Sequence, residues 1–297
     1  MSDSPKKIPV ILDTDIGGDI DDTWALAMML KSPELDVKLV TTDTGNTEYR
    51  AKVAAKMLEV AGRTDVPVGV GVKFGDGSGP QAPWVEKYEL SSYPGTVYED
   101  GVDALIRTIM DSPEPITLIC IGPVPNIGIA LDREPKIAQK ARFVGMHGSI
   151  RLGYGGSEKI SAECNVVNHS KECQKAFTAD WDMTITPLDT CGLVHLKGEK
   201  YRAVYECQDP IIRALIENYR VWAKYSPQSE QRSSTLFDTV AVYLAFCDEL
   251  LVMEKLGVRV TDDGYTVIDE NAKIINCAMS WKDLPAYEDF LVKRLIT

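Results

Sequence analysis

Short apolar runs alternate with longer segments of helical spacing along most of the chain. Residues 8–13 (IPVILD), 36–42 (DVKLVTT) and 66–71 (VPVGVG) are short and apolar, as buried parallel strands are. Residues 22–31 and 47–62 carry the apolar spacing of helices. Because two parallel strands must be joined by a crossover connection, this alternation predicts right-handed βαβ units and a parallel sheet.

The alternation continues toward the C-terminus. Further strands are expected at 116–121, 142–146 and 182–188, and further helices at 101–111, 124–132, 170–179, 210–225, 236–247 and 282–296. The runs LGVRVT, YTVID and KIINCAM predict strands at one edge of the sheet, with a hairpin across residues 262–264. The sequence therefore predicts an α/β fold, a single domain over residues 1–297 with a Rossmann-like, mostly parallel sheet and flanking helices, and disorder in residues 1–7.

Residues 73–98 differ from the rest in composition. The segment is rich in Gly, Ser and Pro, yet it carries four aromatic residues, Trp84, Tyr88, Tyr93 and Tyr98. A long loop with aromatics is often a lid over a pocket. A surface excursion with its aromatic side chains tucked underneath explains the composition equally well.

The composition excludes several classes of function. Lys and Arg number 32 against 44 Asp and Glu, a formal charge of −12, which argues against a nucleic-acid partner. No run approaches the ~18 apolar residues of a membrane span, and the five residues IPVIL before Asp13 are too few for a signal peptide. Seven scattered cysteines without a CxxC pair indicate mostly buried, reduced thiols and a cytoplasmic location.

Five aspartates fall within residues 13–22, in the sequence DTDIGGDIDD. So many carboxylates would repel one another strongly if they had no counter-charge. Helix capping and turn formation explain Asp19, Asp21 and Asp22, but not Asp13 and Asp15 at the end of a buried strand. A hard divalent cation explains the density, because Ca²⁺ and Mg²⁺ are held by oxygen ligands.

Two metal-site templates fit this cluster poorly. An EF-hand loop beginning at Asp13 would place Gly17 at its fifth position and Trp24, instead of Glu, at its twelfth. The haloacid-dehalogenase phosphatases carry a DxDx element at a strand end, which residues 13–16 match in part. A Mg²⁺-dependent phosphohydrolase with Asp13 as nucleophile therefore stays as an alternative.

A third template fits better. The cluster resembles the DxDxGxDD signature of the inosine-uridine-preferring nucleoside hydrolases, with two extra residues before the final Asp pair. Other elements similar to motifs of that family follow in order between residues 8 and about 250: Thr44-Gly45-Asn46, IGPVPNI (121–127), FVGMHG (143–148), AECN (162–165), Leu188-Asp189-Thr190 and Phe237-Asp238. Each motif alone is weak, but the ordered set is specific.

The resemblance implies hydrolysis of the N-glycosidic bond of a ribonucleoside, or of a related N-ribosyl compound, to free base and ribose. It implies a Ca²⁺ held by the side chains of Asp15, Asp22 and Asp238 and by the main-chain carbonyl of Ile121. Asp15 would also accept the proton of the Ca-bound water. Asp13 would support these ligands from behind.

The resemblance also implies the substrate contacts. Asp21 and Asn46 would bind the ribose 2′- and 3′-hydroxyls, and Glu163 and Asn165 the 5′-hydroxyl. Met146 would pack beneath the sugar. Taken singly, these residues could equally be core or strand-end residues, so the assignment depends on the joint match. A homodimer or homotetramer is expected by resemblance alone.

The chain departs from the family pattern at the leaving base. Purine-acting members carry a His before the last Asp, where this chain has Phe237, and a second family His is also missing. His147 is the candidate replacement acid. Tyr219, Trp222 and Tyr225, at helical spacing, could instead stack on the base or simply pack in the core. The base specificity therefore stays open. A family member that binds ribose without turnover stays as a further alternative.

Overall fold

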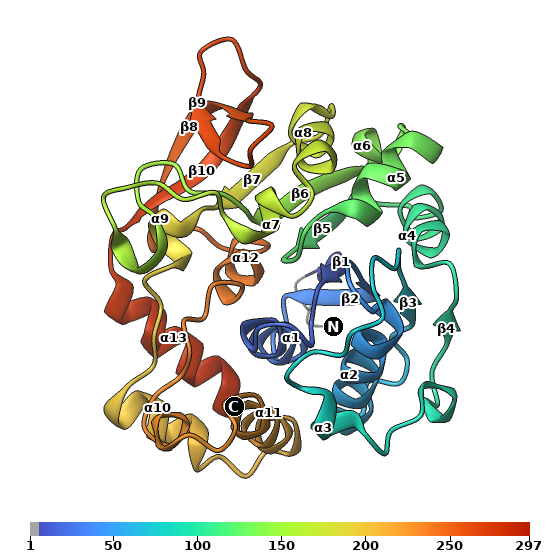
Figure 1. Ribbon diagram of the computed structural model, residues 1–297, viewed down its shortest axis with the longest axis vertical. Coiled ribbons are helices and arrows are strands. Elements are labelled where there is room, and N and C mark those ends of the chain that lie inside the picture. The colour runs from blue at the N-terminus through green and yellow to red at the C-terminus, as the bar shows by residue number, and fades with distance from the viewer. Residues whose placement is uncertain (1–5) are drawn as a thin grey trace, which may run out of the picture.

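The computed structural model describes residues 6–297, and a ten-stranded sheet forms its centre (Figure 1). The strand order is β4-β3-β2-β1-β5-β6-β7-β10-β8-β9. The strands are β1 (Ile8–Thr14), β2 (Leu35–Thr42), β3 (Val68–Val70), β4 (Val97–Tyr98), β5 (Ile116–Cys120), β6 (Ala141–Met146), β7 (Met183–Thr186), β8 (Leu251–Val260), β9 (Thr266–Ile268) and β10 (Ile274–Trp281). The disorder expected for the N-terminus falls largely on residues 1–5, which lie outside the described residues.

The sheet is parallel from β4 across to β10, and only β8 and β9 run antiparallel to their neighbours. The predicted mostly parallel α/β fold is thus confirmed, as are the edge strands and the hairpin across residues 262–264. Thr261 N donates to Tyr265 O at 2.8 Å to close that hairpin.

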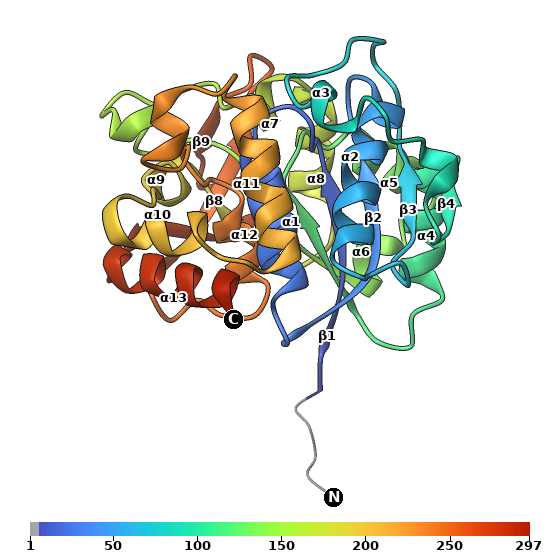
Figure 2. The ribbon, with the colours of Figure 1, turned by 90° about the horizontal axis from the view of Figure 1, so that it is seen from below.

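Helices cover both faces of the sheet. One face carries α1 (Asp21–Leu30), α2 (Thr47–Val60), α11 (Pro210–Trp222) and α12 (Thr239–Leu244); the other carries α4 (Gly101–Met110), α5 (Pro125–Arg133), α6 (Ile137–Lys140) and α8 (Ser170–Thr178). The remaining helices are α3 (Ala82–Val85), α7 (Cys164–Val167), α9 (Leu188–Cys191), α10 (Gly198–Tyr205) and α13 (Leu284–Ile296), with 3-10 turns at Leu90–Ser92, Tyr154–Gly156 and Pro227–Glu230. Figure 2 shows α11 beside α1 and α13 beside α10.

Two hydrophobic cores lie on opposite faces of the sheet, and β1 contributes to both. Val10 and Leu12 pack with α1, whereas Ile11 packs with α4 and α5. This follows from the two-residue period of strand side chains. Asp13 lies on the same face of β1 as Ile11, so its side chain points toward α5.

Two predicted helices are shorter than expected. The helix predicted at 210–225 ends at Trp222, because Lys224 and Tyr225 adopt positive φ values of 51° and 56°. The helix predicted at 236–247 begins only at Thr239. A positive φ is hard to read from sequence for residues other than Gly and Asn.

Aromatic side chains of residues 73–98 face inward against the rest of the protein, and none of these residues lines the cavity described below. Trp84 and Tyr93 are buried in the core beside α2, and the Tyr93 hydroxyl donates to Val66 O at 2.7 Å. Gln81, also buried, donates to Asp19 O at 2.8 Å and accepts from Asn218 at 2.6 Å. The segment is therefore an excursion with its aromatics packed underneath.

The seven cysteines are free thiols, and four of them are buried, as the sequence predicted. Among residues 6–297, no helix combines the length and the apolar character that crossing a bilayer requires.

Candidate active site

A cavity of about 140 Å³ opens at the carboxyl ends of the central strands, where α/β proteins place their ligands. Six of its lining side chains are carboxylates: Asp15, Asp19, Asp21, Asp22, Glu163 and Asp238. The other lining residues are Ile121, Met146, Tyr154, Cys164, Asn165 and Phe237. The structure thus brings most of the predicted site residues to one place.

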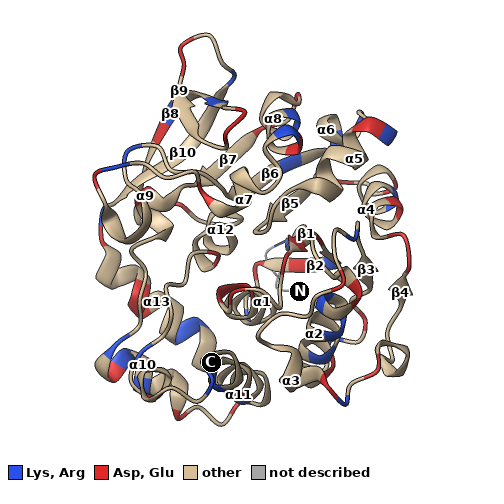
Figure 3. Cartoon of the chain, in the orientation of Figure 1, with Lys and Arg blue, Asp and Glu red and all other residues tan. Residues whose placement is uncertain are grey.

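Three buried aspartates form a tight group. Carboxylate oxygens of Asp21, Asp22 and Asp238 lie within 4.8 Å of one another. Asp21 and Asp22 occupy the first turn of α1, where the helix dipole favours negative charge, and Asp238 directly precedes α12. Figure 3 shows acidic positions in red at the start of α1 and next to α12. Asp238 makes no capping hydrogen bond with its side chain, so helix capping does not explain it.

The charges of this trio are costly without a cation. Burial raises the pKa of Asp21, Asp22 and Asp238 well above the usual range, and repulsion from neighbouring carboxylates raises it further. Thr14 donates a short hydrogen bond to Asp22. Ca²⁺ and Mg²⁺ are bound by hard oxygen ligands. The trio offers buried carboxylate oxygens whose negative charge outweighs the positive charge nearby, so these residues fit a divalent cation.

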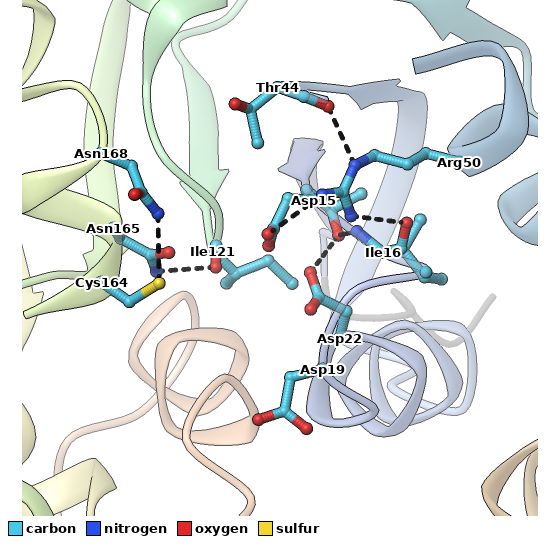
Figure 4. Close-up of polar contacts among 12 residues, drawn as sticks. Asp15, Ile16, Asp19, Asp22, Thr44, Arg50, Ile121, Cys164, Asn165 and Asn168 are labelled. Atoms are coloured by element: carbon cyan, nitrogen blue, oxygen red, sulfur yellow. Dashed lines mark hydrogen bonds and ion pairs between the residues drawn. The ribbon is translucent and has the colours of Figure 1, made fainter. Parts of the chain in front are cut away.

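Asp15 lies at the end of the same cavity and is held by Arg50 of α2 (Figure 4). Arg50 Nη2 lies 3.6 Å from Asp15 Oδ2, while its Nη1 and Nε donate to Ile16 O at 3.1 Å and Thr44 O at 2.9 Å. Burial raises the pKa of Asp15, and the positive charge of Arg50 opposes the rise. The resemblance implies Asp15, Asp22 and Asp238 as the carboxylate ligands. The three carboxylates that lie within 4.8 Å of one another are instead Asp21, Asp22 and Asp238.

Asp13 lies behind the cavity rather than in it. Its Oδ1 accepts from Thr41 at 2.6 Å and from Asn126 of α5 at 2.8 Å, and the side chain is fully buried. Burial raises its pKa to about 6. A nucleophile must reach its substrate, so this position does not favour the phosphohydrolase alternative; it agrees with a supporting role.

The opposite wall of the cavity carries Glu163, Asn165 and Met146. Glu163 accepts from Gly148 N at 3.0 Å and from Asn165 N at 2.8 Å, and burial raises its pKa to about 7. The Asn165 amide donates to Ile121 O at 2.9 Å (Figure 4). It also donates to Met146 O at 3.0 Å. The Ile121 carbonyl still has a second lone pair, so it could also face a cation.

Aromatic side chains form one end of the cavity. The rings of Phe237 and Tyr154 meet edge to face, with centroids 6.1 Å apart at 85°. The Tyr154 hydroxyl accepts from Cys164 N at 3.0 Å. The structure therefore joins Phe237, the predicted substrate-binding residue, to a tyrosine that the sequence did not indicate.

His147 does not reach the cavity, contrary to the catalytic role predicted for it. Its ring is fully buried on the other face of β6, against Phe143 and Phe177, and burial lowers its pKa to about 3. Successive residues of an extended chain point to opposite sides, so Met146 in the cavity sends His147 away from it.

Asn46 does not line this cavity either. Its Oδ1 accepts from Tyr49 N at 3.1 Å as the N-cap of α2, and its Nδ2 donates to Asp76 O at 3.0 Å. It lines a separate surface hollow of about 520 Å³ beside α2 and α3. The ribose contact implied for Asn46 therefore has no support in this geometry.

Of the aromatic residues predicted to form a stripe, only Tyr219 lies fully in the core. Tyr219 is buried, stacks on Trp222 at 5.8 Å between centroids, and meets Trp24 edge to face. Tyr225 is 66% exposed beyond the helix. Core packing, one of the two interpretations left open by the sequence, thus accounts for Tyr219.

Two further residues near the site were not found from the sequence. Asp43 follows β2, is fully buried, and neither of its carboxylate oxygens has a hydrogen-bond partner among the described residues. Burial and the charges of Asp13 and Asp15 raise its pKa well above the usual range. The position of Asp43 directly after a strand could have indicated it from the sequence. Arg50, the second residue, lies on a helix, and no sequence pattern shows that its side chain turns toward the site.

Several solved structures that are similar in fold are nucleoside hydrolases by title. They include a plant nucleoside hydrolase, PpNRh1 (TM-score 0.83, 22% identity, covering 98% of this chain and 100% of that one), and an inosine-uridine preferring nucleoside hydrolase from Bacillus anthracis (0.78, 18%, 97% and 100%). A purine-preferring ribonucleoside hydrolase from Gardnerella vaginalis is also similar (0.77, 20%, 97% and 98%).

The family follows from the sequence match. The family model described as inosine-uridine preferring nucleoside hydrolase matches residues 10–288, so the chain belongs to this family and is an enzyme. A curated relative, the pyrimidine-specific ribonucleoside hydrolase RihA of Citrobacter koseri, is 28% identical over 238 residues, 73% of this chain and 72% of the relative. RihA of Escherichia coli strain HS is 28% identical over 235 residues, 73% of each chain.

Proposed function

We propose that this nucleoside hydrolase cleaves the N-glycosidic bond of a ribonucleoside or related N-ribosyl compound, giving free base and ribose, with Ca²⁺ as cofactor. The observation that carries the proposal is the buried trio Asp21, Asp22 and Asp238, which shares one cavity with Asp15. The relatives named ribonucleoside hydrolases support the reaction. They differ in base preference by name, so they leave the base open.

The cation would be held by Asp22 and Asp238, with Asp15 or Asp21 as a third carboxylate and the Ile121 carbonyl as a neutral ligand. When bound, it supplies a fixed positive charge that orients water and makes it more acidic. It would also offset the repulsion that raises the pKa of these carboxyls.

Asp15 is the proposed base that takes the proton of the attacking water. The contact with Arg50 favours its ionised form, the form that accepts a proton. Arg50 is itself fixed by two main-chain carbonyls, so the Asp15 carboxylate is held in one orientation.

The sugar would lie between the acidic trio and the wall of Glu163 and Asn165. Asp21 would accept from a ribose hydroxyl, Glu163 and Asn165 would bind the 5′ end, and Met146 would pack against the ring. A site with a polar partner for each hydroxyl discriminates against deoxyribose, because a missing hydroxyl leaves a buried group unpaired.

The test is incubation with a panel of ribonucleosides and release of reducing sugar as the readout. We expect hydrolysis of at least one ribonucleoside, its loss on chelation, and its recovery on adding Ca²⁺. Binding of ribose with no turnover by calcium-loaded protein would contradict the proposal and identify a binding member of the family. Phosphate release from simple phosphate esters would favour the phosphohydrolase.

The proposal extends to a homodimer or homotetramer in the cytoplasm. Free thiols support a reducing compartment. Sedimentation equilibrium on the purified protein tests the oligomeric state.

A further inference from the structure

Six carboxylates crowd the cavity, but its aromatic end is different in chemistry. Phe237, Tyr154 and Cys164 meet there. Phe237 directly precedes Asp238, one of the close trio, so this end adjoins the acidic one. A flat heterocycle is the part of a nucleoside that suits aromatic neighbours.

Tyr154 brings a hydrogen-bond donor to this end. Its hydroxyl oxygen accepts from Cys164 N at 3.0 Å, and among the hydrogen bonds of residues 6–297 none uses the hydroxyl proton. Burial and the nearby Glu163 carboxylate raise the pKa of Tyr154, so the hydroxyl keeps its proton at neutral pH. Phe237, by contrast, has no polar atom to offer.

The residues just before Tyr154 are anchored to the protein by a buried carboxylate. Asp189, itself buried, accepts three main-chain N–H groups in succession, from Ile150 at 2.9 Å, Arg151 at 2.8 Å and Leu152 at 3.1 Å. The ring is then braced edge to face by Phe237. A donor fixed before the substrate arrives costs little reorganisation during the reaction.

We propose that Tyr154 is the leaving-group residue of this enzyme, its hydroxyl donating a hydrogen bond to a ring nitrogen or carbonyl oxygen of the departing base. This rests on the proposed function. As the C1′–N bond breaks, its electron pair passes to the base, and water oxygen forms the new bond to C1′ while its proton goes to Asp15. Tyr154 keeps its proton, and the base takes one from solvent.

Tyr154→Phe tests this, because the variant retains the ring and its packing. Two substrates are compared: the best ribonucleoside from the panel and 4-nitrophenyl β-D-ribofuranoside, whose leaving group is stable as an anion. Removing one donor to developing charge costs about 100-fold in kcat. We expect that loss with the nucleoside and a loss below about 3-fold with the nitrophenyl substrate.

Tyr98→Phe is the matched control, since Tyr98 lies on the edge strand β4 away from the cavity. Thermal unfolding of both variants verifies that they fold. Introducing Phe237→His into the Tyr154→Phe protein should restore part of the nucleoside turnover, because a donor then returns to the same end of the cavity.

Three outcomes would overturn the inference while leaving the proposed function intact. Equal losses on both substrates would mean that Tyr154 acts on the sugar. Unchanged turnover of both would mean that it has no role. Selective loss in Asp19→Asn, but not in Tyr154→Phe, would give the role to that carboxylate. Wild-type protein that cleaves neither substrate would overturn the proposed function, and this inference with it.

Discussion

The two ends of the cavity are built in different ways. The acidic end takes Asp21 and Asp22 from the first turn of one helix and Asp238 from the start of another. The aromatic end takes Tyr154 from a loop segment and Phe237 from the turn before α12. The acidic end thus draws three carboxylates from the starts of two helices, whereas the aromatic end draws its rings from loop segments. Under the proposed function, the cation-binding end and the base-binding end could therefore vary separately.

The largest expected effect comes from the acidic end. Asp238→Asn should lower kcat by about 1,000-fold, since a bound cation contributes several kcal/mol of charge stabilisation. It should also abolish the rise in melting temperature on adding Ca²⁺. Steady-state kinetics and thermal unfolding with and without Ca²⁺ measure both.

Asp180→Asn, at an exposed position, is the control for the charge change and should leave both readouts unchanged. If Asp238→Asn kept full activity, the cation would have to be held elsewhere, and the contrast between the two ends would fail.

Stability of the cation-free protein should fall as pH rises. Folding raises the pKa of Asp13 from 3.8 to about 6 and that of Glu163 from 4.5 to about 7. The folded state then binds more protons than the unfolded state between about pH 4 and pH 7, so the free energy of unfolding decreases across that window. Chemical denaturation in chelator at a series of pH values measures it.

Adding Ca²⁺ should oppose this loss. A ligand that binds only the folded state at 100 times its Kd stabilises by about 2.7 kcal/mol. The gain should be larger at pH 8 than at pH 5, because protonated carboxyls bind cations poorly. A calcium effect that did not vary with pH would argue against a site made of carboxylates with raised pKa values.

A smaller effect is expected at the aromatic end. Phe237→Ala removes a ring contact worth about 1 kcal/mol, so KM for the ribonucleoside should rise about 5-fold, with kcat changing less. Phe237→Tyr, which keeps the ring, should retain the wild-type KM. A collapse of kcat in Phe237→Ala would instead indicate that Phe237 positions Asp238.

The smallest effect is expected from His147→Leu, because His147 lies outside both ends of the cavity. Both ring nitrogens of His147 are buried without a hydrogen-bond partner among the described residues, so an apolar replacement removes unpaired polar atoms. We expect kcat/KM within about 2-fold of wild type. A hundred-fold loss would restore the catalytic role predicted from sequence.

Much of the fold was predictable from sequence for a simple reason. The apolar run of β1 and the helical spacing of α1 are local patterns, and each packs as its period requires. The carboxylates at residues 15–22 follow from the same local pattern. Glu163 and Asn165 could be placed only through the resemblance, because nothing in their own neighbourhood distinguishes a binding site from an ordinary loop.

The remaining features depend on tertiary structure. Arg50 turns inward to two carbonyls that come from separate loops. His147 was assigned wrongly to the cavity side because one step along an extended chain reverses the direction of the side chain. Tyr154 reaches Phe237 only through the long loop after β6. None of these contacts has a sequence period that could reveal it.

The packing of α12 against α1 has a consequence for local unfolding. Asp238 at the start of α12 faces the aspartates of α1 across this interface, so in cation-free protein like charges act against the docking of a six-residue helix. Hydrogen exchange should therefore be faster in Thr239–Leu244 than in α1, and Ca²⁺ should slow it. The cation would join the first and last thirds of the chain much as a crosslink does, with a strength set by its concentration.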